Sequence, residues 1–470
     1  MQIATETERK YDVPADFTLP GLPGTGEEHT HELDATYYDT DDLRLARHKR
    51  TLRRRSGGTD AGWHLKTPGE GSSRTEHRLP LDGDDVPAEL LDEVRAIVRD
   101  ATLRPVARLR TVRRETPLCD DDGRTLALIE QDRVTAETDD GEQQWQEVEV
   151  ELVDGDAALL KRVEKALLKA GARPASGPSK LARALGGRLT PDRGGQAGPV
   201  AAYVRAQRDA ILAYDPGVRR GEPEAVHKMR VATRRLRSTL RTFKAAFDPE
   251  RAAYLKPELK WLAGQLGEVR DGQVLEGKLL AAVEEEGAEF APVARSIREH
   301  LDAKIEDGRR ALADDLNGER YLRLLAAIDD LVDESAAGGD GGGVKRVRKA
   351  LRTADGLLDE ATLTGRDEPL HEARKAYKRA RYAVEVFAGS AGRPGTKLID
   401  RLTDLQDVLG AHQDSVVARE ILRELAGRAP DAFPYGILHA RQEQVGRNTL
   451  GDLGGVVAAS RKRKLRAWLS

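Results

Sequence analysis

The strongest constraint on the fold is a change of hydrophobic period near residue 190. Up to about residue 187 the chain reads as short strand-like segments separated by Gly-Gly, Asp-Gly and Pro-Gly dipeptides. The stretch GGRLTPDRGGQAGP (186–199) has no apolar period and is typical of a linker. From about residue 200, long amphipathic segments rich in Ala, Leu, Arg and Glu indicate helices. We therefore expect an α+β protein with two different domains and a linker at 188–198.

The first domain, residues 1–187, has about eight candidate strands and two candidate helices, near residues 88–98 and 157–170. Many short strands with turn residues between them favour an antiparallel β-barrel, here with flanking helices. One cysteine, Cys119, excludes an internal disulfide and fits a reducing cytoplasm. No apolar run approaches the roughly 18 residues of a membrane helix, so we expect no membrane partner. The oligomeric state stays open.

The second domain, residues 199–470, contains an internal duplication. HKMRVATRRLRSTLRTF begins at His227 and HEARKAYKRARYAVEVF begins at His371, a separation of 371 − 227 = 144 residues. LGEVRD at Leu266 and LGAHQD at Leu409 match at a separation of 143. Two matches at nearly one offset predict two related four-helix bundles, about 199–334 and 344–470. The glycine-rich stretch 335–343 would separate them.

Charged residues alternate along several strands of the first domain. Glu6, Glu8 and Lys10 share one strand face, and QEVEVEL (146–152) places three carboxylates opposite an apolar face. A solvated surface strand is the alternative reading for any one strand. If the apolar faces contact flanking helices, the charged faces line the interior, where unpaired ions cost several kcal/mol each. Carboxylates suit Mg²⁺ or Mn²⁺, and Arg and Lys suit phosphate, so the pattern indicates a site for metal-bound polyphosphate anions.

These residues carry a resemblance to a known family. ETERK (6–10), YYDT (37–40), LRRR (52–55), HLKTPG (64–69), TEHR (75–78), EVEVEL (147–152) and PSK (178–180) resemble, in order, the CYTH family of triphosphate tunnel metalloenzymes. The resemblance covers roughly residues 1–187 and implies hydrolysis of a phosphate–phosphate bond. It leaves tripolyphosphate, nucleoside triphosphate and thiamine triphosphate open as substrates.

The same resemblance implies roles for individual residues. Those expected to hold the metal, Mg²⁺ or Mn²⁺, are Glu6, Glu8, Glu149 and Glu151. Those expected to bind the triphosphate are Lys10, Arg53, Arg55, Lys66, Glu76, Arg110, Arg114 and Lys180, where Glu76 supports metal or basic side chains. In the arginine-rich strand we favour Arg110 and Arg114 because they share a face. The catalytic set is Glu6, Glu8, Lys10 and Asp132.

Basic residues recur along one helix face in both copies of the duplication. His227, Arg230, Arg234 and Arg237 lie at i, i+3, i+7 and i+10 without interleaved acids, and the second copy repeats the spacing from His371. A solvated helix face is again the alternative. Recurrence favours a long polyanion as the partner. Nucleic acid fits less well because aromatic residues make up 4% of the chain and no helix-turn-helix is evident.

The duplicated pattern, with LG-x-x-x-D after it, resembles the CHAD family of conserved-histidine α-helical domains over about residues 198–470. The resemblance implies binding of inorganic polyphosphate in a basic groove. The residues expected to bind it are His227, Lys228, Arg230, Arg234, Arg235, Arg237, Lys260, Arg270, His371, Arg374, Lys375, Lys378, Arg379, Arg381 and His412.

Together these expectations describe a cytoplasmic, metal-dependent triphosphatase tethered to polyphosphate or to polyphosphate granules. A non-catalytic module that docks on polyphosphate granules is one alternative. A nucleotidyl cyclase is another, because the barrel family includes one. A nucleic-acid-binding protein is the third.

Overall fold

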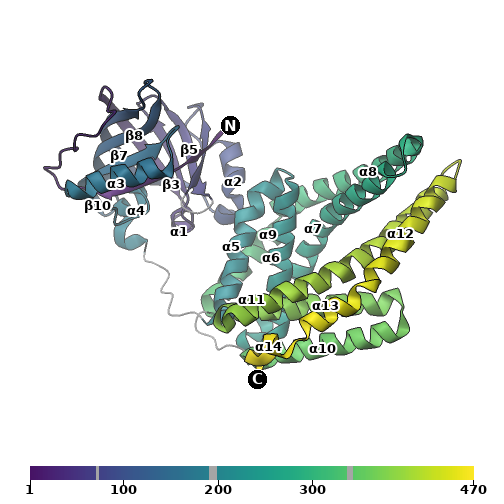
Figure 1. Cartoon of the computed structure of the whole chain (residues 1–470). Coiled ribbons are helices and arrows are strands. Elements are labelled where there is room, and N and C mark those ends of the chain that lie inside the picture. The colour runs from purple at the N-terminus through teal and green to yellow at the C-terminus, as the bar shows by residue number, and fades with distance from the viewer. Residues whose placement is uncertain (70–72, 190–197, 336–341) are drawn as a thin grey trace. The chain divides into compact units, whose positions relative to one another are not determined.

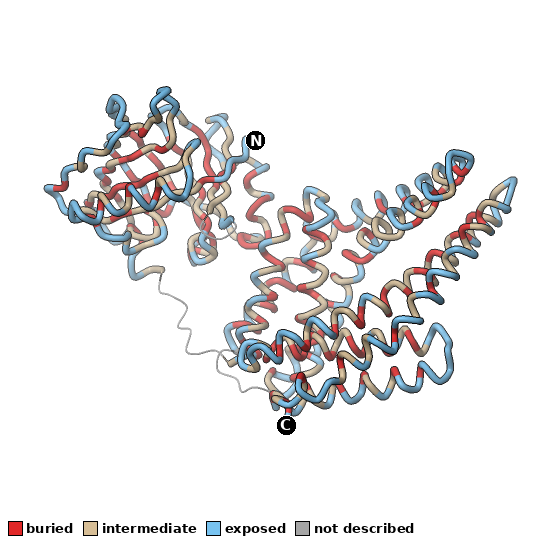
Figure 2. The backbone as a smooth tube through the Cα atoms, in the orientation of Figure 1, coloured by how far each residue is buried: buried red, intermediate tan, exposed pale blue. Residues whose placement is uncertain are grey.

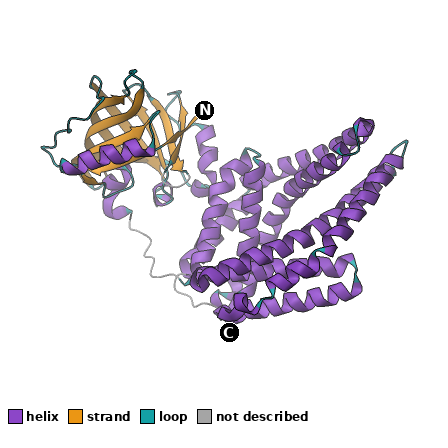
Figure 3. Ribbon diagram, in the orientation of Figure 1, coloured by secondary structure: helices purple, strands orange, loops and turns teal. Residues whose placement is uncertain are grey.

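The computed structural model describes residues 1–69, 73–189, 198–335 and 342–470. The chain forms two compact units, Met1–Arg193 and Gly194–Ser470 (Figures 1 and 3). The first unit is built on strands and the second is helical. Residues 190–197 of the predicted linker, and 336–341 of the predicted break between repeats, lie outside the described residues.

The first unit contains one antiparallel sheet. The single strand expected at the start of the chain is divided in two, and a short strand is added after the last expected one. The strands are β1 (Gln2–Glu6), β2 (Glu8–Asp12), β3 (His29–Asp39), β4 (Thr51–Ser56), β5 (Gly62–Pro68), β6 (Arg74–Leu79), β7 (Arg104–Cys119), β8 (Thr125–Thr138), β9 (Gly141–Leu152) and β10 (Arg173–Pro174).

The strand order is β1-β6-β5-β4-β3-β7-β8-β9-β2-β10, which leaves β1 and β10 at the two edges. Closure into a barrel, as predicted, is therefore not confirmed. The sheet is nevertheless strongly curved, because Thr7 alone separates β1, which pairs with β6, from β2, which pairs with β9. This one segment therefore pairs with strands near both ends of the strand order. Its charged side chains lie close to charged side chains of most other strands.

Short helices cover parts of this sheet. They are α1 (Arg44–Arg47), α2 (Ala88–Val98), α3 (Ala157–Lys169), α4 (Lys180–Leu185) and the 3₁₀ turn η1 (Gly186–Arg188). α3 packs Leu160 and Val163 against Val148 and Val150 of β9. The apolar face of β9 is thus turned to a helix, as the alternation in its sequence predicts, and its carboxylate face is turned the other way.

The second unit consists of helices and short 3₁₀ turns. The first copy contains α5 (Pro199–Arg219), α6 (Pro223–Thr242), η2 (Lys244–Ala246), α7 (Pro249–Glu284), η3 (Ala288–Phe290), α8 (Ala291–Asn317) and α9 (Glu319–Ser335). The second contains α10 (Gly343–Thr364), α11 (Asp367–Ala426), α12 (Phe433–Gly451), α13 (Leu453–Ser460), α14 (Arg463–Arg466) and η4 (Ala467–Leu469). α9 exceeds the four helices expected in the first copy, and α13 and α14 exceed the four expected in the second, where α11 contains two helices.

The duplication is visible in how the two copies meet. α11 holds two helices that join at Gly392, whose φ of 59° favours glycine, and these correspond to the separate α6 and α7. Phe243 and Phe387, which are 144 residues apart, contact each other with ring centroids 5.6 Å apart. Equivalent side chains that touch each other mark a pseudo-two-fold relation between the copies.

Buried residues follow the helix faces that pack together within this unit (Figure 2). One apolar cluster joins α7 and α8 to α11 and α12, with Leu279, Ile297, Leu422 and Leu438 fully buried. None of the described helices is long and apolar enough to cross a membrane.

Candidate functional site

The charged faces of the strands surround a pocket of about 70 Å³ in the first unit. Its walls carry comparable numbers of basic and acidic side chains, which come from β1, β2, β4, β5, β6, β7, β8 and β9, from α4 and from the β4–β5 loop. The basic ones are Lys10, Arg53, Arg55, Lys66, Arg74, Arg78, Arg113 and Lys180; the acidic ones are Glu6, Glu8, Asp60, Glu76, Glu130, Glu149 and Glu151.

Residues 6–10 supply three of the charged side chains that line the pocket. Glu6, Glu8 and Lys10 all line the pocket, although a strand break falls between Glu6 and Glu8. Arg9 points the other way and pairs with Glu164 of α3. The alternation in the sequence therefore predicts correctly which side chains of this segment face the pocket.

One wall is organised around Glu76, which is fully buried. Its Oε1 lies 3.0 Å from His64 Nδ1, 3.7 Å from Lys66 Nζ and 3.8 Å from Arg53 Nη2. Burial would raise the pKa of Glu76, but His64, Lys66 and Arg53 outweigh it and hold that pKa far below the usual range. Lys66 also binds Glu6, with Nζ 2.5 Å from Oε2. Glu76 is thus an ionised anchor for the basic side chains.

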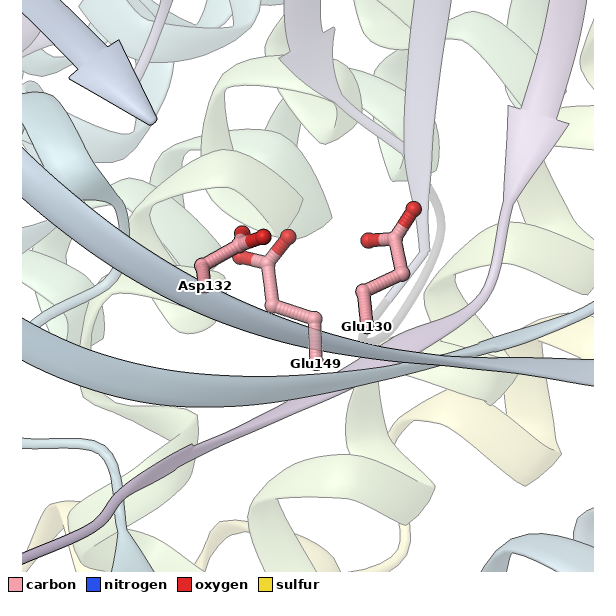
Figure 4. A group of neighbouring side chains, drawn as sticks. All are labelled: Glu130, Asp132 and Glu149. Atoms are coloured by element: carbon pink, nitrogen blue, oxygen red, sulfur yellow. The ribbon is translucent and has the colours of Figure 1, made fainter. Parts of the chain in front are cut away.

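A second group beside the pocket consists of three buried carboxylates, Glu130, Asp132 and Glu149, whose oxygens lie within 4.8 Å of one another (Figure 4). Among the described residues this is the group with the spacing of a metal site. Cations already neutralise it, because Arg113 binds Asp132 and Glu130, and Lys180 Nζ lies 2.8 Å from both Asp132 and Glu149. We interpret this group as a structural ion cluster, with Asp132 beneath the pocket wall.

Arg113 takes the place that the sequence assigned to Arg110 and Arg114. Arg113 shares its strand face with Leu109, which is buried, and Arg110 and Arg114 share theirs with the exposed Val112. Arg110 pairs with Glu137 outside the pocket, and Arg114 is exposed. The prediction of these two as pocket residues is therefore wrong. Arg113 and Arg114 are adjacent, so their sequence alone does not show which of them faces the pocket. The position of the apolar Leu109, on the same strand face as Arg113, could have shown it.

The four predicted metal ligands all line the pocket, but they are not equivalent. Glu149 is neutralised by Lys10 and Lys180. Glu8 and Glu151 are directly opposite each other on β2 and β9, an arrangement that is unfavourable between like charges. Burial and the nearby Glu6 raise the pKa of Glu151 to about 6.

Glu8 has a second feature that favours a cation. Its Oε1 is buried and has no hydrogen-bond partner among the described residues, with Arg74 Nε 3.9 Å away. Oxygen ligands of this kind are those that Mg²⁺ and Mn²⁺ prefer. Glu8 pairs with Lys10 through its other oxygen, Oε2, at 3.0 Å. With Oε1 unbonded and Glu151 uncompensated, these two carboxylates still fit a divalent cation better than the cluster at Asp132, which two cations bind.

In the second unit, basic side chains of α6 and α11 lie together. Arg230 forms a bidentate pair with Asp271, with distances of 2.6 and 2.7 Å. Burial together with Arg234 and Arg374 lowers the pKa of Lys378 to about 6. Three arginines and a lysine that gains its full charge only beside an anion form this crossing, which we name the central cluster (Arg230, Arg234, Arg374 and Lys378). Among the described residues one carboxylate, Asp271, is directly paired with it, so the central cluster is strongly attractive to anions.

Several other predicted polyphosphate ligands already have partners. Arg235 and Arg381 both bind Glu385, at 2.9 and 2.6 Å. His412 is buried, and its Nε2 lies 3.0 Å from Asp367 Oδ1. Asp367 is not part of the central cluster. Lys228 and Lys375 pair with Glu224 and Glu372 of their own helices.

The remaining predicted ligands lie at partly exposed or exposed positions. His227 and His371 are partly exposed, and burial and neighbouring cations lower the pKa of each: Arg270 beside His227, and Lys375 beside His371. Lys260 is exposed on α7. The sequence missed Arg241, which continues the basic face of α6 one turn beyond Arg237.

Comparison with known proteins agrees with this division of the chain. The CYTH domain model matches residues 4–185 and the CHAD domain model matches residues 202–423. An uncharacterized protein of Mycobacterium tuberculosis (strain CDC 1551 / Oshkosh) is 40% identical over 482 residues, covering 93% of this chain and 92% of its own. The chain belongs to the CYTH–CHAD proteins. Its CYTH domain contains the charged pocket, and its CHAD domain contains the central cluster.

Two solved structures each match a little over half of the chain. PptA from Streptomyces chartreusis is 21% identical, with a TM-score of 0.47, and the match covers 55% of this chain and 98% of that one. The CHAD domain from the plant Ricinus communis is 27% identical, with a TM-score of 0.42, and the match covers 57% and 91%.

Proposed function

We propose that the CYTH domain hydrolyses the phosphate–phosphate bonds of tripolyphosphate with bound Mg²⁺ or Mn²⁺, and that the CHAD domain binds inorganic polyphosphate. CYTH family members are triphosphatases or cyclases. The observation that carries the proposal is the pocket, where eight basic and seven acidic side chains share one small volume. Such an arrangement suits a ligand that is itself a polyanion with a bound cation.

Within the pocket, the acidic and basic side chains divide the work. Glu8 and Glu151, with Glu6 and Glu149 beside them, would hold the cation. When bound, a divalent cation neutralises phosphate charge and lowers the pKa of a bound water molecule. Lys10, Arg53, Arg55 and Lys66 would hold the phosphate oxygens and stabilise charge on the transferred phosphoryl group. Lys180 and Arg113 line the same pocket and also contact the buried carboxylates of Asp132 and Glu149.

The protonation states support this assignment. Burial and the neighbouring Arg53 lower the pKa of Arg55 to about 9, so Arg55 remains protonated at neutral pH. Burial lowers the pKa of Lys66, but Glu76 and Glu8 outweigh it and raise that pKa overall. Both side chains therefore present positive charge to a phosphate chain.

The test is phosphate release from tripolyphosphate by the full chain, measured with Mg²⁺, with Mn²⁺ and with EDTA. We expect metal-dependent release that falls at least a hundredfold in Glu8→Gln, because that change removes a charged ligand at the proposed cation site. Glu27→Gln, at an exposed position outside the pocket, is the matched control and should release phosphate at the parent rate. Unchanged turnover in Glu8→Gln would refute the metal assignment, and no release by the parent would refute the hydrolase.

A further inference from the structure

The two copies of the CHAD domain differ at one position that decides where the basic surface is open. Residues 144 apart are equivalent, so Arg235 corresponds to Arg379 and Arg241 corresponds to Glu385. In the structure Arg235 Nε lies 2.9 Å from Glu385 Oε2. At the pseudo-two-fold equivalent of that ion pair, Arg379 takes the place of Arg235 and Arg241 takes the place of Glu385. Two like charges therefore lie where the other copy has an ion pair.

The end of the crossing that contains Glu385 is closed to further anions. Glu385 accepts from Arg381 at 2.6 Å and from the Tyr203 hydroxyl at 2.6 Å, in addition to its pair with Arg235. Its side chain is 9% exposed. We name this group the Glu385 ion cluster. The arginines in it are neutralised by a carboxylate of the protein itself.

The other end, which we name the open triad, consists of Arg237, Arg241 and Arg379. None of the three has an ion pair with another described residue. Burial together with Arg241 lowers the pKa of Arg379, and burial together with Arg241 and Arg234 lowers that of Arg237. The like charges therefore destabilise one another here, and an anion would relieve that repulsion.

One carboxylate, Glu372, compensates the charge of Arg379 only in part, since the pKa of Arg379 is still lowered overall. Glu372, which acts on Arg379, is itself paired with Lys375 at 2.7 Å. Arg234, Arg237 and Arg241 lie on one face of α6, at intervals of three and four residues. The open triad is therefore continuous with the central cluster through Arg234, which also acts on Lys378.

The chemistry of the open triad fits one part of a polyphosphate chain better than the rest. An internal phosphate has two free oxygens and one negative charge. A terminal phosphate has three free oxygens and, like a phosphomonoester, a charge of roughly −1.5 to −2 at neutral pH. Three guanidinium groups can donate paired N–H bonds to three phosphate oxygens. Their combined positive charge exceeds the single negative charge of one internal phosphate.

We propose that Arg237, Arg241 and Arg379 bind the terminal phosphate of a polyphosphate chain whose body lies along the central cluster. The chain would then bind in one direction, with its end at the open triad, because the Glu385 ion cluster at the equivalent place cannot accept an anion. This inference rests on the proposed binding of polyphosphate by the CHAD domain, and adds to it a preference for chain ends.

The experiment compares two linear polyphosphates of the same length. One has free ends, and in the other both terminal phosphates are blocked as phosphoramidates of an amine that carries no other charge. Dissociation constants are measured with the full chain. We expect the parent to bind free ends roughly tenfold more tightly, the scale of one charge-assisted contact. In Arg241→Glu that preference should be lost, because the new carboxylate would pair with Arg379 and Arg237 as Glu385 pairs with Arg235 and Arg381.

Two further variants complete the test. Arg310→Glu, at an exposed position on α8, makes the same change of charge and should keep the preference. Arg241→Gln removes the charge without adding one and should reduce the preference, so the result does not depend on how the glutamate variant folds. Equal binding of free and blocked chains by the parent, or an unaltered preference in both Arg241 variants, would overturn the chain-end site alone. Absence of any polyphosphate binding by the parent would overturn the proposed function as well.

Discussion

Glu149 and Glu151 are two residues apart on the same face of β9, yet their pKa values are shifted in opposite directions. Burial raises the pKa of both. At Glu149 the neighbouring Lys10 and Lys180 outweigh burial and hold the pKa well below its usual range. At Glu151 burial is reinforced by Glu6, and the pKa rises to about 6. The same residue type in the same pattern is therefore a paired carboxylate at one position and an uncompensated one at the next.

The pKa of Glu151 predicts how the metal-free protein depends on pH. The folded state binds the proton more tightly than the unfolded state, so stability falls as pH rises from about 4.5 to about 6 and the loss persists above that range. The shift corresponds to about 2 kcal/mol. We expect Glu151→Gln to raise the free energy of unfolding by up to that amount at pH 7 in EDTA, and to change it little at pH 4.5.

Denaturant unfolding of the parent and the variant at the two pH values measures this. Glu149→Gln is the contrasting variant: it leaves Lys10 and Lys180 with one carboxylate fewer and should destabilise the protein at pH 7. Equal effects of the two substitutions at pH 7 would contradict the difference between the two sites.

At the scale of the elements, the glycine of the duplicated LG-x-x-x-D motif lies against an arginine of the preceding helix. A Cβ on Gly267 of α7 would lie 3.2 Å from Arg230 Nη2, and one on Gly410 of α11 would lie 3.5 Å from Arg374 Nη2. An arginine of the preceding helix therefore lies across the backbone at each glycine, tightly at Gly267 and at ordinary van der Waals distance at Gly410. In the first copy the motif's aspartate, Asp271, then binds that arginine.

This packing predicts a graded effect at Gly267. An alanine requires the flexible end of Arg230 to move by a few tenths of an ångström and improves helix propensity by roughly 1 kcal/mol, so Gly267→Ala should leave stability and polyphosphate binding nearly unchanged. Gly267→Leu should displace the guanidinium from Asp271 and weaken polyphosphate binding roughly tenfold, the scale of one charged contact. Binding and melting temperature should be measured together. Parent-like binding in Gly267→Leu would exclude Arg230 from the site.

At the scale of the molecule, the CYTH and CHAD domains have separate cores, so their sites should fail separately. We expect replacement of Arg230, Arg234, Arg374 and Lys378 by Ala to weaken polyphosphate binding at least a hundredfold at low salt. The dependence of log K on log salt should become shallower by roughly 3, because fewer counterions are released. Hydrolysis of tripolyphosphate should remain at the parent rate.

Glu8→Gln should show the reverse: no hydrolysis, with binding of long polyphosphate by the CHAD domain retained. Titration of both variants across salt concentrations, beside the phosphate-release assay, measures this separation. Loss of hydrolysis in the quadruple variant would show that the central cluster serves the CYTH site as well.

Local patterns in the sequence determined much of this structure, because side-chain direction follows from period alone. Strand alternation turned Glu6, Glu8 and Lys10 to one side and the valines of β9 to the other, and the 144-residue offset revealed the repeat. Only the tertiary structure decided which charges remain available. Pairing depends on partners distant in the chain: Glu130 and Asp132 bind Arg113, Glu385 neutralises Arg235, and Arg241 has no such partner among the described residues. Electrostatic energy is set by distance in space, and distance along the chain does not give it.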